Sequence, residues 1–249
     1  MFYLFSKIFN LYSVCFIFLF VNLNFSQQHL PNKINSKIDS LIQSSIKEQA
    51  FPGAQVYIKI EDTVLINQSF GYHTYDSLVK VQNSHAYDLA SLTKPLASTL
   101  AIMKIYEDFD IDLNSPISDY LPELRKSNKK NTSFIEAMSH TAGWIPYINH
   151  HYLLIRKNGK LKRSIVRDKQ SKRFNLKVSE GLFIRESYHK KIYRKIKNSE
   201  IKNPGEYLYS GLFFFYVPKL IEQITSKSYE NYLNDYFYSK TNNRSLSFN

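Results

Sequence analysis

Cysteine is almost absent from this chain of 249 residues, with a single example at position 15. Cys15 lies inside a short apolar run, residues 14–21, and not at its end, so we do not interpret it as a lipid-attachment site. If the N-terminal segment is removed on export, the mature protein has no cysteine. Disulfide bonds and zinc sites with cysteine ligands are then excluded.

Glycine and long hydrophobic runs are also scarce. The 7 glycines argue against glycine-rich loops that bind nucleotides. The run 14–21 is shorter than the roughly 20 apolar residues that a membrane-spanning helix needs. With 43% hydrophobic and 22% charged residues, the composition is that of an ordinary globular protein.

The first 26 residues are typical of an export signal. They contain one charge, Lys7, followed by the apolar run and by a small residue, Ser26. We expect residues 1–26 to be a signal peptide, residues 27–249 to be the mature domain, and the protein to be periplasmic or extracellular. An uncleaved N-terminal anchor is the alternative.

Acidic residues are rare in residues 154–203, which carry 17 lysines and arginines against 4 acids. This segment accounts for the whole net charge of +12. It is either a surface for polyanions or membranes or a solvated insertion. We favour the insertion, because its aromatic residues are not interleaved as stacking platforms for nucleic acid would be.

The hydrophobic periodicity predicts a helix, two strands and then almost only helices. Residues 34–46 have an apolar helical face, and residues 54–60 and 63–70 alternate as a hairpin. Further helices are expected at residues 91–108, 132–139 and 209–225, the first with Leu92, Leu96, Leu100 and Met103 on one face and the last followed by the segment 229–237. Two strands alone make a marginal sheet, which suggests that strands are missing.

Ser91 and Lys94 form a Ser-x-x-Lys element at the predicted start of a helix. Residues three apart lie on one helical face, so the ammonium can reach the hydroxyl. A serine hydroxyl becomes a useful nucleophile only when a neighbouring base takes its proton. Alone, however, the pattern is weak, because an N-cap serine with an exposed lysine gives it too.

The surrounding sequence strengthens the pattern. Residues 87–95 (YDLASLTKP) resemble the nucleophile segment of the β-lactamase-related serine hydrolases, which include class C β-lactamases, penicillin-binding proteins and D-alanyl-D-alanine carboxypeptidases. Further similar segments follow in the same order along the chain: 51–54 (FPGA), 70–72 (FGY), 113–122 (LNSPISDYLP), 138–143 (MSHTAG) and 204–210 (PGEYLYS).

The resemblance implies a role for Tyr209, which stands where the family has Tyr-x-Asn. In the family this tyrosine is thought to act with the lysine as general base, so Ser91, Lys94 and Tyr209 are the expected catalytic residues. Gly211 replaces the asparagine, whose amide would hold the lysine and the substrate carbonyl. The packed-aromatic alternative for Tyr209 has some weight, because residues 213–216 (FFFY) are close by.

The resemblance also implies an α+β fold, an antiparallel sheet with a helical subdomain. The sheet part should cover about residues 30–90 and the mainly helical part about 91–249. No Lys-Thr-Gly or His-Thr-Gly follows Tyr209, so the C-terminal sheet strands of the family are expected to be missing. Residues 140–143 (HTAG) precede the tyrosine and are interpreted as structural.

Three hypotheses follow. The first is a secreted serine hydrolase that forms an acyl-enzyme with an amide, β-lactam or ester, with a small molecule or a peptidoglycan-type compound as substrate. The second is a catalytically impaired, truncated remnant that at most binds a ligand. The third is a polyanion or membrane-surface binder acting through residues 154–203. No cofactor and no nucleic acid partner are expected, and His150 and His151 lack a third ligand for a metal.

Overall fold

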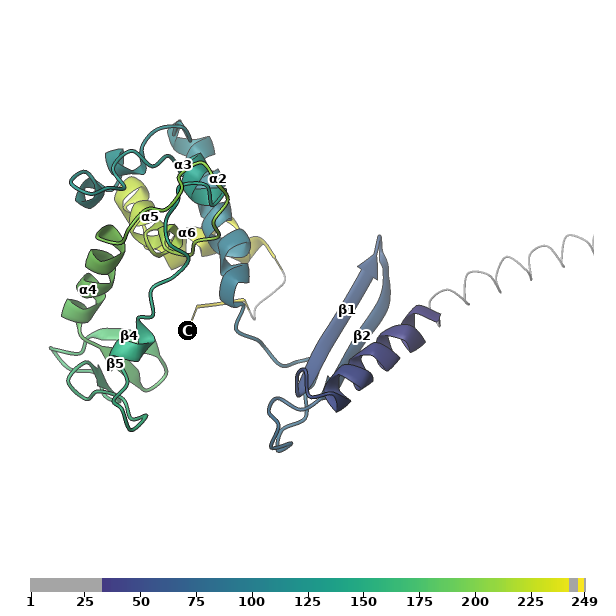
Figure 1. Ribbon diagram of the computed structural model, residues 1–249. Coiled ribbons are helices and arrows are strands. Elements are labelled where there is room, and N and C mark those ends of the chain that lie inside the picture. Colours follow the sequence, from purple (N-terminus) through teal and green to yellow (C-terminus); the bar gives the residue numbers. More distant parts are fainter. Residues whose placement is uncertain (1–32, 242–245, 249) are drawn as a thin grey trace, which may run out of the picture. The chain divides into compact units, whose positions relative to one another are not determined.

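The computed structural model describes residues 33–241 and 246–248 (Figure 1). The predicted signal peptide and Cys15 lie outside these residues. The chain divides into two compact units, one ending at Tyr87 and one beginning at Asp88. In the part that the structure describes, no helix has the length and apolar character needed to cross a bilayer.

The first unit is the predicted helix and hairpin. The helix covers residues 33–47, and strands β1 (Gly53–Ile60) and β2 (Thr63–Gly71) pair antiparallel from Gly53↔Gly71 to Ile60↔Thr63. Glu61 begins the connecting turn with a φ of 51°. Helix and strands lie side by side (Figure 1). Both predictions are confirmed, because each rests on a periodicity in which one face is more buried than the other, although Leu41 of the helix is 60% exposed.

The second unit is built around three helices: α2 (Leu100–Phe109), α5 (Val217–Thr225) and α6 (Tyr229–Tyr236), which pack on one another. Their buried residues include Ile102, Ile105, Leu220, Ile221 and Leu233, each at most 1% exposed. Trp144, 2% exposed, belongs to the same core. This core carries the site described below.

The apolar face predicted for residues 91–108 was wrong for three of its four residues; only Leu100 packs against the core. Leu92, Leu96 and Met103 are 57%, 42% and 58% exposed. The core-facing residues are instead Ala97, Ala101, Ile102 and Ile105. Residues Lys94–Thr99 form a π-helical segment, η2, which has more residues per turn than an α-helix and shifts the phase of the face.

Helix α3 (Phe134–Met138) lies within the predicted range 132–139. It begins with a capping box: Glu136 N–H donates to Ser133 Oγ at 3.2 Å, and Ser133 N–H donates to Glu136 Oε2 at 2.8 Å. Short 3₁₀ turns η3 (Ile117–Asp119) and η4 (Pro122–Leu124) precede it and place Ile117 and Leu121 in the core.

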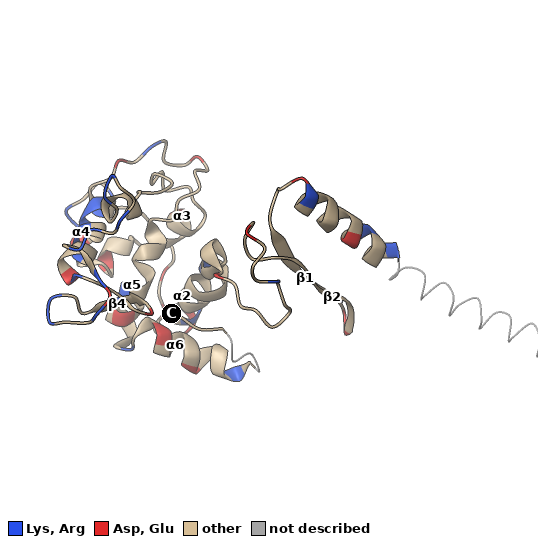
Figure 2. Cartoon of the chain, turned by 90° about the horizontal axis from the view of Figure 1, so that it is seen from below, with Lys and Arg blue, Asp and Glu red and all other residues tan. Residues whose placement is uncertain are grey.

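The prediction of almost only helices after residue 91 was wrong for the basic segment. Strands β3 (Val166–Arg167), β4 (Leu176–Ser179) and β5 (Leu182–Ile184) form an antiparallel sheet in the order β3-β5-β4, followed by helix α4 (Glu186–Lys197). Strands of two to four residues are too short to give a period-2 signal. Lysine and arginine gather over α4 and the neighbouring loops (Figure 2).

The helix predicted from Tyr209 begins later. Residues 209–211 are not helical, and a 3₁₀ turn, η6 (Phe213–Phe215), comes before α5. Pro218 in the first turn of α5 is consistent with this start, because proline is tolerated there. The start was misplaced because the aromatic run 213–216 extends the apolar pattern backwards.

Candidate active site

Ser91 lies in a 3₁₀ turn, η1 (Ala90–Leu92), immediately before η2. Ala90 has a φ of 44°, a left-handed conformation that costs an L-residue about 1–2 kcal/mol. An Asx-type contact supports it, because Ala90 N–H donates to Asp88 Oδ1 at 2.8 Å. The turn leaves Ser91 exposed at the start of the helical segment.

The three predicted catalytic side chains meet at the Ser91 hydroxyl. Lys94 Nζ donates to Ser91 Oγ at 3.0 Å, and Tyr209 Oη donates to the same oxygen at 2.9 Å. Ser91 and Tyr209 are 118 residues apart in the sequence. Hydrogen-bond contact between a nucleophile and two groups that can exchange its proton is the arrangement that covalent catalysis requires.

The charge and hydrogen bonds around Tyr209 change the acidity of its phenol. The Lys94 ammonium, and after it the hydrogen bond with Ser91, lower the pKa of Tyr209 from its usual value near 10. Lys94 Nζ lies 5.2 Å from the centre of the Tyr209 ring and 5.4 Å from that of Phe214. A positive charge beside the phenol favours the phenolate form, which is the form able to accept a proton.

Tyr209 is held by a pairing of two irregular segments, residues 139–146 and 201–211. Lys202 N–H donates to Gly143 O at 2.7 Å, Leu208 N–H to His140 O at 2.8 Å, and Gly211 N–H to Pro146 O at 3.0 Å. Gly143 has a φ of 69°, and a Cβ there would collide with the carbonyl oxygen of Lys202. The close approach therefore needs glycine.

His140 supports Tyr209 from the same pairing. Its Nδ1 accepts from Ser210 N–H at 3.2 Å, and its ring centre lies 4.5 Å from that of Tyr209. Burial, followed by the charge of Lys94, lowers the pKa of His140. Sequence reasoning took residues 140–143 as structural and did not connect His140 with Tyr209, because no spacing links residues so far apart.

Gly211 stands beside the lysine. A Cβ built on it would lie 3.9 Å from Lys94 Nζ and 4.0 Å from Pro146 O, which are ordinary contacts. The backbone thus has room for a side chain at the position where the resemblance expects asparagine.

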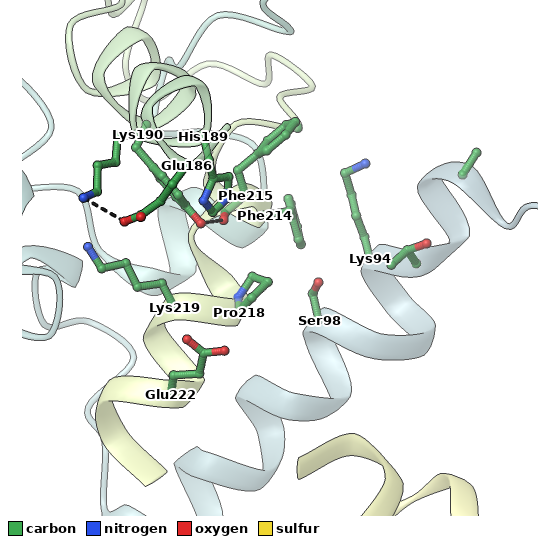
Figure 3. A pocket seen from close by; sticks show the side chains of 14 residues that line it. Lys94, Ser98, Glu186, His189, Lys190, Phe214, Phe215, Pro218, Lys219 and Glu222 are labelled. Carbon is green, nitrogen blue, oxygen red and sulfur yellow. Dashed lines mark hydrogen bonds and ion pairs between the residues drawn. The ribbon is translucent and has the colours of Figure 1, made fainter. Parts of the chain in front are cut away.

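A cavity of about 760 Å³ opens from Lys94 and Gly211 (Figure 3). On the near side its wall includes Phe214 and Lys94; on the far side α4 and α5 contribute ionisable residues. These are Glu186, His189, Lys190, Lys219 and Glu222. Glu186 and Lys190 pair at 2.8 Å. Sequence reasoning did not identify this cavity, since α4 itself was not predicted.

The described residues contain no group of three or more histidine, cysteine, aspartate or glutamate side chains close enough to hold a metal ion. His150 lies against Phe215 at 5.7 Å between ring centres, and His151 against Tyr152 at 4.4 Å. Neither histidine lines the cavity beside Lys94.

Comparison with known proteins decides the family. The sequence profile of the β-lactamase family matches residues 38–249, most of the chain. The chain belongs to the β-lactamase family. This membership supports a function of the serine-hydrolase type and the α+β fold of β-lactamases and transpeptidases.

Individual members of the β-lactamase family are distant. Protein flp of Staphylococcus aureus is 24% identical over 212 residues, which is 84% of this chain and 37% of that protein. Among solved structures, the octameric penicillin-binding protein homologue from Pyrococcus abyssi has a TM-score of 0.60 at 20% identity, covering 82% of this chain and 42% of the other. A class C β-lactamase from Rhodobacter sphaeroides has a TM-score of 0.53 at 17% identity, covering 81% and 47%. The chain thus spans less than half the length of these relatives.

Proposed function

We propose that this chain is an exported serine hydrolase that acts through an acyl-enzyme on an amide, β-lactam or ester bond. The observation that carries the proposal is the convergence of Lys94 Nζ and Tyr209 Oη on Ser91 Oγ, at 3.0 and 2.9 Å. A packed aromatic with no chemical role would have no reason to direct its hydroxyl at the nucleophile.

In the proposed reaction, Ser91 Oγ attacks the substrate carbonyl carbon while its proton passes to the Tyr209 phenolate. The Lys94 ammonium stabilises that phenolate before the transfer. Tyr209 then gives the proton to the departing nitrogen or oxygen as the carbonyl–leaving-group bond breaks. Water then attacks the ester between the acyl group and Ser91 Oγ. This step releases the acid product and regenerates the free Ser91 hydroxyl.

The cavity beside Lys94 supplies the binding space. Its volume of about 760 Å³ lies within the usual range for small-molecule sites. Phe214 offers an apolar surface next to the reacting centre, and the Glu186–Lys190 pair offers both signs of charge farther out. We expect a substrate with an apolar portion near the scissile bond and polar or charged groups beyond it.

The proposal is tested with a fluorophosphonate, which reacts covalently with activated serines. The chain should gain one adduct by intact mass, and peptide mapping should place it on Ser91. Ser91→Ala should remove the adduct. Ser115→Ala, which changes a serine in a turn of the same unit, is the matched control and should label like the unaltered chain.

A fluorescent penicillin used in parallel asks whether a β-lactam is accepted. An adduct at Ser91 with the fluorophosphonate alone would restrict the substrate to other acyl compounds. No adduct with either reagent, in a protein whose circular dichroism shows it folded, would contradict the proposal and leave the ligand-binding remnant as the better account.

A further inference from the structure

Three arginines lie on or beside the small sheet of the basic segment, and none of them lines the cavity beside Lys94. Arg167 lies in β3 opposite Phe183 of β5, and Arg185 directly follows β5. Because Arg185 N–H donates to Ile165 O at 3.2 Å, the β3–β5 register places the side chains of Arg167 and Arg185 on one face of the sheet. Arg173 lies in the turn closed by the Ser171↔Phe174 bridge.

We define the arginine cluster as Arg167, Arg173 and Arg185. Two of its members, Arg167 and Arg185, lie against the ring of Phe174. The ring is 5% exposed, and its centre lies 5.1 Å from Arg167 Cζ and 5.0 Å from Arg185 Cζ. Such contacts are cation–π interactions and orient the two guanidinium groups. Arg167 and Arg185 are half-buried while Arg173 is exposed, so solutes can reach the cluster.

No carboxylate lies within ion-pair distance of the cluster among the described residues, although Asp168 directly follows Arg167 in the sequence. In every ion pair of the part of the chain that the structure covers, the cation is a lysine. Arg167 Nη1 and Arg185 Nε are buried and lack a hydrogen-bond partner there. Buried donors without partners are rare in folded proteins, because each loses its bond with water.

The positive charges of the arginine cluster also repel one another. Burial, followed by the charges of Arg173 and Arg167, lowers the pKa of Arg185. The carboxylate nearest in sequence to Arg185 is Glu186, which pairs with Lys190 at 2.8 Å. A bound anion would therefore relieve the repulsion and satisfy donors that the fold leaves open.

We propose that the arginine cluster, seated on Phe174, is a binding site for a phosphate group. Guanidinium groups match the oxygens of phosphate in paired hydrogen bonds. A tetrahedral phosphate offers more oxygens than a carboxylate and can accept from three arginines at once. The phosphate can be free in solution or part of a lipid headgroup, and the chemistry of recognition is the same.

The test measures binding of inorganic phosphate to the whole chain by calorimetry, at physiological ionic strength. The unaltered protein should show saturable binding and a higher melting temperature in phosphate. The double variant R167Q/R185Q should bind about tenfold more weakly or worse, because charge-assisted hydrogen bonds are lost. The matched control is K157Q/K160Q, which removes two exposed charges from the same segment and should bind within about twofold of the unaltered protein.

Two further variants guard against misfolding and against simple charge effects. R173Q changes only the exposed arginine and should also weaken phosphate binding severalfold. R167K/R185K keeps both charges but not the planar fork, so it should bind clearly more weakly than the unaltered chain. Equal binding by R167K/R185K would overturn recognition by guanidinium geometry.

Vesicles distinguish the source of the phosphate. Binding to phosphatidylcholine vesicles that contain phosphatidylglycerol, lost in R167Q/R185Q and competed by phosphate, would support a lipid headgroup. Phosphate binding without vesicle binding would support a soluble ligand. The proposal is overturned if phosphate shows no saturable binding, or if K157Q/K160Q loses as much as R167Q/R185Q. Labelling of Ser91 is a separate readout and need not change in any of these variants.

Discussion

At the residue scale, the site depends on groups whose separate identities are ordinary. Ser91, Lys94 and Tyr209 form a site because Lys94 Nζ and Tyr209 Oη lie 3.0 and 2.9 Å from Ser91 Oγ. The sequence predicted these three residues because Ser91 and Lys94 are neighbours on a helical turn and Tyr209 follows a family-like segment. It could not predict His140, whose contact with Tyr209 arises only from the pairing of two loops.

A substitution at Gly211 tests the site at the scale of a single residue. Replacing it with asparagine, Gly211→Asn, should raise the rate of Ser91 labelling by about two- to tenfold, because one added hydrogen bond contributes about 0.5–1.5 kcal/mol. The space exists, since a Cβ would lie 3.9 Å from Lys94 Nζ. The rate of fluorophosphonate labelling is the measurement.

Gly211→Ala is the control for this prediction, because it adds the Cβ without the amide. It should label at about the rate of the unaltered chain. An equal gain in both variants, or a loss in Gly211→Asn, would show that an amide at this position does not act on Lys94.

At the scale of elements, periodic segments were predictable and irregular ones were not. The hairpin and the first helix follow from alternation and from three- and four-residue steps. The pairing of residues 139–146 with 201–211 has no period, and the strands β3 to β5 are too short to have one. The sequence singled out residues 138–143 and 204–210, but it did not predict the pairing between them that positions Tyr209, nor the sheet that carries the arginine cluster.

Lys129 joins such elements from inside the core. Its side chain is fully buried, donates to Ser199 O at 2.6 Å and to Asn128 Oδ1 at 3.1 Å, and lies 5.3 Å from the centre of the Trp144 ring. It thereby connects the loop before α3 with the segment that follows α4. Burial lowers the pKa of Lys129 from 10.5 to about 8.

This lowered pKa predicts a pH dependence of stability. Between pH 8 and 10.5 the unfolded chain keeps the proton on Lys129 while the folded chain releases it. The contribution of Lys129 to the free energy of unfolding therefore rises with pH across this window, by about 1.4 kcal/mol per pH unit at most and by about 1–3 kcal/mol in total. Buried tyrosines act in the opposite direction near pH 10, because the pKa values of Tyr193, Tyr229 and Tyr232 are raised to about 12. Urea denaturation at several pH values therefore shows the rise as a difference from a variant that lacks Lys129.

Lys129→Met is the comparison, because it has a similar volume and no titrating group. The difference in unfolding free energy between the unaltered chain and Lys129→Met should grow in favour of the unaltered chain as the pH increases from 8 to 10. A difference that stays constant over this range would contradict the lowered pKa.

At the scale of the whole molecule, the order of the motifs was more informative than any single one. Six family-like segments in the same order predicted the β-lactamase family, which the match over residues 38–249 confirms. The concentration of positive charge in residues 154–203 was also predictable from the sequence, but the proposed phosphate site within it was not. That the arginines of residues 167–185 share a sheet face depends on a register that composition does not reveal.

The central claim is that Ser91, Lys94 and Tyr209 act as one unit. The most direct test is the rate of fluorophosphonate labelling from pH 6 to 10 in the unaltered chain, Tyr209→Phe, Lys94→Met and the double variant. General-base catalysis contributes about 10²–10⁴-fold, so each single variant should lose a large part of the rate, and the double variant should lose little more than the worse single one.

The same measurement tests the direction in which the pKa of Tyr209 is shifted. Because the phenolate accepts the proton, the rate in the unaltered chain should rise with pH, and the lowered pKa should place this rise below pH 10. Tyr209→Phe should lack it. If Tyr209→Phe labels as fast as the unaltered chain and with the same pH profile, the account of this site is wrong.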